Sequence, residues 1–253
     1  MTAATLSAAP ATVQRSSLAP VHWLLGLQSV VVILLSINRL STLTLGYVAP
    51  NEFLRWVDFN NMLLLPLASL VASYLLKRYL ETRVGGAARD GRAHLALSLV
   101  FIVGVYLLAA SYGDHEVTNY LHARFCPDGG PQLDAALCRI VVFNDDEFSH
   151  WLFFTGFVFM NAALMFLQVL FPHAGKLGRG DAALLVVNGV FIGAGIFANL
   201  AFEVIGLDLY VVALLALIAA GLLWRRGAQP LLVYYVTAYW LGLVATFVVK
   251  ALA

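Results

Sequence analysis

Long apolar stretches separated by short polar connections make up most of this chain. Seven of them approach or exceed the roughly 20 residues that a helix needs to cross about 30 Å of hydrocarbon. They cover residues 20–47, 59–76, 94–112, 148–171, 182–205, 209–224 and 231–249. None alternates apolar and polar positions as a membrane β-strand does. The pattern therefore predicts an all-α, polytopic integral membrane protein with about seven transmembrane helices.

Composition supports lipid as the main solvent of the chain. Hydrophobic residues make up 61% of the sequence and charged residues 11%, whereas soluble domains carry roughly 25% charged residues. The net charge of +1 gives no electrostatic basis for binding nucleic acid. We therefore expect membrane lipid, and not nucleic acid, among the partners.

The chain divides into a tail and one transmembrane domain. Residues 1–19 are rich in Ala, Ser and Thr, which favours a disordered N-terminal tail. The apolar stretch behind them is too long for the core of a signal peptide, so it is interpreted as an uncleaved first span. Residues 20–253 are predicted to form a single seven-helix transmembrane domain with an outer hairpin at 113–147.

Basic residues predict the orientation, because Lys and Arg in short connections mark the cytoplasmic side. With seven spans, four basic places fall on one side: before the first stretch and after the second, fourth and sixth. They contain Arg15, Lys77, Arg78, Arg83, Arg89, Arg92, Lys176, Arg179, Arg225 and Arg226. The N-terminus is therefore predicted to be cytoplasmic and the C-terminus outside, in a plasma membrane or a bacterial inner membrane.

The two cysteines, Cys126 and Cys138, both lie in the connection assigned to the outside. Eleven residues lie between them and include a run of Pro, Asp and Gly that favours turns. Cysteines outside the cytoplasm usually form disulfides. The sequence thus predicts a disulfide that closes the hairpin, with a metal-binding or redox thiol pair as the alternative.

Histidines and carboxylates gather at the two outer helix ends that flank this connection. They are Asp114, His115, Glu116 and His122 after the third stretch, and Asp145, Asp146, Glu147 and His150 before the fourth. Imidazole and carboxylate together are ligands of zinc, iron and copper. The alternative is an ordinary interfacial belt, in which acids at a helix start complement the helix dipole.

Spacing selects the candidate metal ligands within this cluster. On a helix, His150 shares a face with Asp146 at i,i+4 and with Glu147 at i,i+3. His115 and His122 are about 10.5 Å apart if they are helical, so one ion would take one of them and a two-metal site both. These five residues are the predicted ligands of a divalent transition metal: zinc, iron or copper.

Two glutamates are the candidate catalytic carboxylates. Glu116 lies inside the cluster, and Glu203 lies at the same outer level of the fifth stretch. Charges elsewhere in the spans are scarce, which argues against a proton-coupled transporter, because such proteins carry ionisable groups along their spans.

The pattern Ser111-x-x-x-His115, followed by Asp145, faintly resembles the seven-helix metal-dependent hydrolases that include alkaline ceramidases and adiponectin receptors. The resemblance implies a zinc site at these helix ends. That superfamily also carries a His-x-x-x-His pair on its seventh helix, and the seventh stretch of this chain contains no histidine. The motif therefore does not assign the chain to that superfamily.

The sequence favours a membrane-embedded, metal-dependent enzyme whose site lies at the outer face and acts on a lipid-like or small hydrophobic substrate. A transporter or channel with an acidic outer vestibule is the first alternative. The second is a non-catalytic assembly subunit whose outer hairpin docks a membrane partner or a second copy of the chain.

Overall fold

The computed structural model describes residues 17–83, 91–202 and 206–252. Within these ranges, seven helices are long and apolar enough to cross a membrane, which confirms the predicted number of spans. Residues 1–16 of the predicted tail lie outside the described residues.

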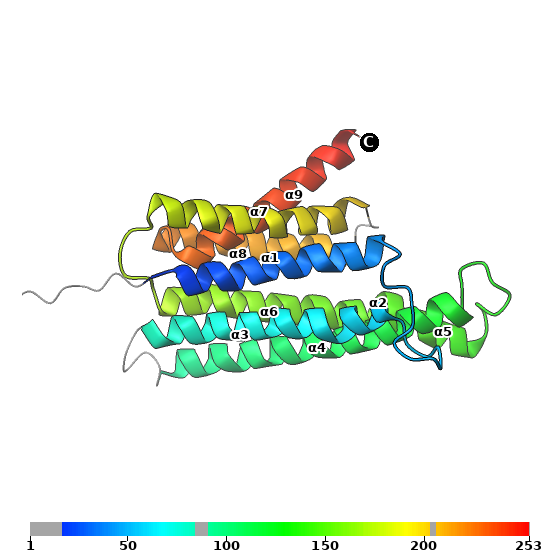
Figure 1. Cartoon of the computed structure of the whole chain (residues 1–253). Coiled ribbons are helices and arrows are strands. Elements are labelled where there is room, and N and C mark those ends of the chain that lie inside the picture. The colour runs from blue at the N-terminus through cyan, green and yellow to red at the C-terminus, as the bar shows by residue number, and fades with distance from the viewer. Residues whose placement is uncertain (1–16, 84–90, 203–205, 253) are drawn as a thin grey trace, which may run out of the picture.

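The spans pack side by side as a bundle, and α9 leans away from it toward the C-terminus (Figure 1). Two spans contain a π-helical turn, at Asn60–Leu64 and at Phe143–Phe148, between their α-helical parts. The α-helices are α1 (Ala19–Leu40), α2 (Trp56–Phe59), α3 (Leu65–Arg83), α4 (Arg92–Phe125), α5 (Ala136–Val142), α6 (Ser149–Leu170), α7 (Arg179–Phe202), α8 (Leu207–Arg226) and α9 (Pro230–Leu252).

The two ends of the bundle differ in charge. The last residues of α3, α6 and α8 lie at the end where α1 begins, which we call the basic end (Figure 1). The connections that follow α1 and α4 lie at the opposite end, which we call the hairpin end. The predicted orientation, with the basic end in the cytoplasm, rests on this charge asymmetry.

The predicted outer hairpin is mostly helical. α4 does not end at residue 112 but runs to Phe125, so that its 34 residues span about 51 Å and exceed the hydrocarbon thickness. Its polar last turns are held by contacts to the connection between α1 and α2: Tyr120 and Arg124 both donate to the carbonyl of Glu52. The predicted disulfide between Cys126 and Cys138 is confirmed and joins the end of α4 to α5.

The first span is shorter than predicted, because α1 ends at Leu40 rather than at residue 47. The chain then folds back over the hairpin end and forms a short antiparallel bridge between Tyr47 and Arg55. Arg55 donates two 2.8 Å hydrogen bonds to the buried Asp58, and this pairing raises the pKa of Arg55 above its ordinary value. Its guanidinium also lies over the ring of Tyr120 on α4, so the connection is fixed to that helix.

Glycines bring two pairs of helices into backbone contact, as small residues do in membrane proteins. A Cβ on Gly104 of α4 would lie 2.6 Å from the backbone nitrogen of Met160 on α6. A Cβ on Gly156 of α6 would lie 2.8 Å from the carbonyl oxygen of Gly104. The α4–α6 pair therefore has a fixed crossing point near the middle of both helices.

From the sequence, Gly189, Gly193, Gly195 and Gly206 are expected to be close-packing positions of the fifth span. Gly189 and Gly193 confirm this, because a Cβ on either would lie 2.9 Å from a carbonyl oxygen of α9. Gly195 faces α1 instead, where a Cβ would lie 2.8 Å from a methyl group of Val32. Gly206 is not on α7 at all, because it precedes α8 as its N-cap.

A charged network is buried near the basic end. Lys77, expected in a connection, lies inside α3 and donates to Glu81 one turn further along the helix. His94 of α4 places its Nε2 atom 2.7 Å from Oε1 of Glu81. Because buried charges are stable only when paired, this network ties α3 to α4.

We expect a bulky side chain at the α4–α6 crossing to destabilise the fold. Gly156→Leu should lower the free energy of unfolding by about 1–3 kcal/mol, the usual cost of overpacking, because the two atoms nearest to its Cβ belong to the backbone of α4. Gly221→Leu on α8 is the matched control, since a Cβ there meets no atom within 4 Å. Thermal unfolding in detergent, followed by helical circular dichroism, measures both; equal melting temperatures would contradict the crossing.

Candidate functional site

A cavity of about 850 Å³ opens inside the bundle and is lined by residues of all seven spans. On α1 its lining extends from Leu25 to Arg39. At 1.5 Å per residue, that separation corresponds to a depth of about 21 Å along the helix axis. The cavity thus reaches from the hairpin end well into the predicted membrane.

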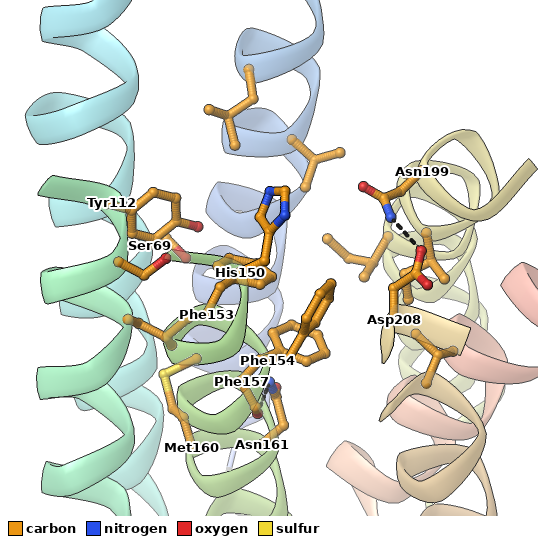
Figure 2. A pocket seen from close by; sticks show the side chains of 18 of the residues that line it. Ser69, Tyr112, His150, Phe153, Phe154, Phe157, Met160, Asn161, Asn199 and Asp208 are labelled. Atoms are coloured by element: carbon orange, nitrogen blue, oxygen red, sulfur yellow. Dashed lines mark hydrogen bonds between the residues drawn. The ribbon is translucent and has the colours of Figure 1, made fainter. Parts of the chain in front are cut away.

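The inner part of the cavity is mostly apolar and aromatic. Phe153, Phe154 and Phe157 of α6 project into it, and Met160 lies beneath them (Figure 2). Three of the polar side chains at this depth are paired with one another: Gln28 donates to Ser73, and Ser69 donates to Gln28. This amide and these hydroxyls therefore have partners where they face an apolar ligand.

The mouth of the cavity is polar and charged. Arg39, His115, Glu116, Asp146, Glu147 and His150 line it. The guanidinium of Arg39 lies 3.1 Å from Oε1 of the buried Glu116 and 3.3 Å from Nε2 of His115. The rings of His115 and His150 are 5.2 Å apart, centroid to centroid. A cation, an acid and two imidazoles thus meet where the apolar cavity opens.

The contacts of His115 assign its tautomer. Arginine can only donate hydrogen bonds, so Nε2 of His115 accepts from Arg39 and the ring proton is on Nδ1. That Nδ1 lies 3.0 Å from Oδ1 of Asp145. Although the two atoms are close, neither Nδ1 of His115 nor Oδ1 of Asp145 has a well-formed hydrogen bond within the described part of the chain. The acceptor nitrogen of His115 therefore faces the cavity mouth.

Asp145 links the histidines of α4 to the π-helical turn Phe143–Phe148. Its side chain is 2% exposed, and its second oxygen, Oδ2, lies 2.9 Å from Nδ1 of His122. One carboxylate therefore contacts two histidines that are two helical turns apart. Ser149 supports the same turn by donating to the carbonyl of Asp145 and accepting, through its own carbonyl, from Ser111.

His122, Asp145 and Asp146 form a group that could hold a metal ion, because their ligand atoms all lie within 4.8 Å of one another. One imidazole and two carboxylates match the preferences of zinc and iron. The buried Oδ1 of Asp145, which lacks a well-formed hydrogen bond, is a further coordination position of the kind a metal ion uses. Asp146 also lines the cavity, so the group adjoins the mouth.

The predicted ligands fall into two sets. His122 and Asp146 lie in the metal-binding group, whereas His115, Glu147 and His150 lie at the cavity mouth outside it. From the sequence, His150 is expected to share a metal with Asp146. Its Nδ1 lies 2.9 Å from the backbone carbonyl oxygen of Asp146, and His150 is not part of the metal-binding group found among the described residues.

Of the two predicted catalytic carboxylates, only Glu116 lies among the described residues. Glu116 is buried, lines the cavity mouth and is paired with Arg39. Glu203 lies outside the described residues.

Two acids of the site are not among the predicted site residues. From the sequence, Asp145 resembles an acid that faces water at the start of a helix. No sequence pattern indicates the π-helical turn that buries Asp145. Asp208 lines the cavity wall opposite His150 and accepts from Asn199 at 3.2 Å (Figure 2). The signal for Asp208 is its place in the first turn of α8, where an acid complements the helix dipole.

No family model, curated protein sequence or solved structure matches this chain. The chemistry of the site therefore rests on its geometry.

We expect the burial of Asp145 to make it far more important for folding than its neighbour. Asp145→Asn should lower the free energy of unfolding by about 3–5 kcal/mol, because a buried charge network loses its central member. Asp146→Asn, at an exposed position, should change it by about 0.5 kcal/mol or less. Denaturant or thermal unfolding in detergent compares the two, and equal destabilisation would contradict the role of Asp145.

Proposed function

We propose that this protein is a membrane-embedded, metal-dependent enzyme that acts on a lipid-like substrate. The observation that carries the proposal is the cavity, whose apolar interior lies within the spans and whose mouth combines two histidines with acids and Arg39. Ligand sites typically enclose about 300–1,000 Å³ and pair an apolar lining with a few convergent polar groups. The volume of about 850 Å³ and the polar mouth fit that description.

Each set of residues has a proposed role. The aromatic wall of α6 binds the apolar part of the substrate, and the mouth orients its polar part. His122, Asp145 and Asp146 would hold a divalent ion: zinc, iron or copper. Such an ion, when bound, supplies a Lewis acid or a water of lowered pKa. Glu116, buried at the mouth, is the catalytic carboxylate that this arrangement favours.

The proposed site faces the outer leaflet. The basic residues favour the opposite end of the bundle as cytoplasmic. The disulfide at the hairpin end is consistent with this, because disulfides persist outside the cytoplasm. A lipid-like substrate would therefore reach the mouth from the outer half of the membrane.

Transport or conduction is the second candidate, and the depth of the cavity favours it. About 21 Å of a hydrocarbon layer of roughly 30 Å is already open from one side. Its inner end is closed by buried apolar side chains, among them Leu25 and Leu76. A transporter would have to open this end, whereas an enzyme would keep it closed.

Metal analysis tests the proposed centre. Wild-type protein, purified and loaded with zinc, iron or copper, should retain about one ion per chain after desalting. Asp146→Asn, which should remain folded, is expected to weaken retention by about tenfold or more, because it removes one of three ligands. Glu147→Gln changes an adjacent exposed acid outside the group and should retain the ion. If the wild type and both variants all lose the metal on desalting, the proposal of a metal-dependent enzyme is contradicted.

A comparison of lipid products tests the reaction. Nanodiscs of mixed lipids should yield a new product mass with the metal-loaded wild type, and Glu116→Gln should reduce its rate by about 10²-fold or more. Asp134→Asn, at an exposed acid between α4 and α5 that does not line the cavity, should keep most of the activity. Passage of a solute across liposomes without any product would instead support the second candidate.

A further inference from the structure

The inner end of the cavity is a closed floor at one defined level. Gln28 of α1 bonds to Ser73 of α3, which sets these two residues side by side. Leu25 and Leu76 each lie three positions closer to the basic end and are about 1% and 2% exposed. Both line the cavity. They therefore form a common floor between α1 and α3.

The space behind this floor is filled by apolar side chains. Val21 lies one turn beyond Leu25 on α1, Leu80 lies one turn beyond Leu76 on α3, and both are buried in the same core as the floor residues. An apolar chain cannot extend past the floor without displacing closely packed side chains, which is costly. The floor therefore sets a sharp limit on how far an apolar ligand can penetrate.

The length of the cavity matches that of a membrane lipid chain. One leaflet supplies about half of the roughly 30 Å hydrocarbon thickness, and one extended chain crosses it. The cavity depth of about 21 Å accommodates such a chain together with a polar group at the mouth. Arg39, His115 and His150 lie at the mouth, whereas the floor is apolar. A lipid can therefore bury its hydrocarbon chain and keep its head group among polar partners in one orientation only.

We propose that the ligand is a long-chain amphiphile that lies along the bundle axis, with its head group at the Arg39–His115–His150 mouth and its chain end at the Leu25–Leu76 floor. The cavity then acts as a ruler of chain length. This inference rests on the proposed function for the site and adds the class and orientation of its substrate.

Asn161 is the position at which the ruler can be shortened. It lines the cavity beside Met160, near the inner end, and its amide donates only to the carbonyl of Phe157 one turn earlier on its own helix (Figure 2). That carbonyl belongs to a regular helix, so the loss of this bond leaves the backbone ladder intact. A phenylalanine at 161 would add bulk to the cavity and remove space from the chain end.

The test uses the full chain in nanodiscs that contain an equimolar series of saturated fatty acids from dodecanoate to octadecanoate. Native mass spectrometry measures which chain lengths remain bound to the protein relative to the bilayer. The wild type should be enriched in the longer chains. Asn161→Phe should lower the bound ratio of octadecanoate to dodecanoate by about tenfold, because overpacking penalises only the chains that reach position 161. Leu99→Phe is the matched control, because Leu99 is an exposed side chain of α4 that does not line the cavity, and it should leave the ratio unchanged.

The outcomes separate the ruler from the enzyme. A shifted ratio in Asn161→Phe without conversion of any bound lipid supports the ruler and counts against the enzyme. Equal loss of all chain lengths in this variant, or a wild type without chain preference, overturns the ruler. Formation of product with no dependence on chain length also overturns it and leaves the enzyme proposal standing.

Discussion

The backbone contact of α4 with α6 at Gly104 and Gly156 sets the geometry on which the site depends. The two helices run in opposite directions from this fixed point, so positions further along α4 meet positions earlier in the α6 span. That alignment brings His115 and His122 opposite Asp145. Side chains larger than glycine at the crossing would separate the helices and with them the histidines from the carboxylate.

Close packing in one part of the bundle is linked to open space in another. α4 lies against α6 and α7 lies against α9 through their glycines, whereas the large side chains Phe153, Phe154 and Phe157 point into the space between these pairs (Figure 2). In a membrane, helices gain little from burying apolar surface against one another, because lipid chains are equally apolar. An apolar cavity open to a lipid-like ligand therefore costs little stability, provided that its polar groups remain paired.

The sequence could predict what depends on apolar length and on compartment: the seven spans and the Cys126–Cys138 disulfide. It misplaced the end of α4, because the polar residues after 112 continue a helix that the first outer connection supports. It also could not place Asp145. The burial of Asp145 depends on a π-helical turn, which adds one residue to a turn of the helix. The side chains therefore point in directions that the regular spacing of an α-helix does not predict.

The two ends of the cavity differ in what a ligand would have to displace in order to pass. At the mouth, Arg39 is half exposed and shares its donors between Glu116 and His115, so a ligand's polar group can replace one of these contacts at modest cost. At the inner end, Leu25 and Leu76 are buried with Val21 and Leu80 behind them, so a ligand could pass only by separating closely packed side chains. Exchange of ligand is therefore favoured at the hairpin end and opposed at the basic end, which suits a site that binds from one leaflet more than a path through the membrane.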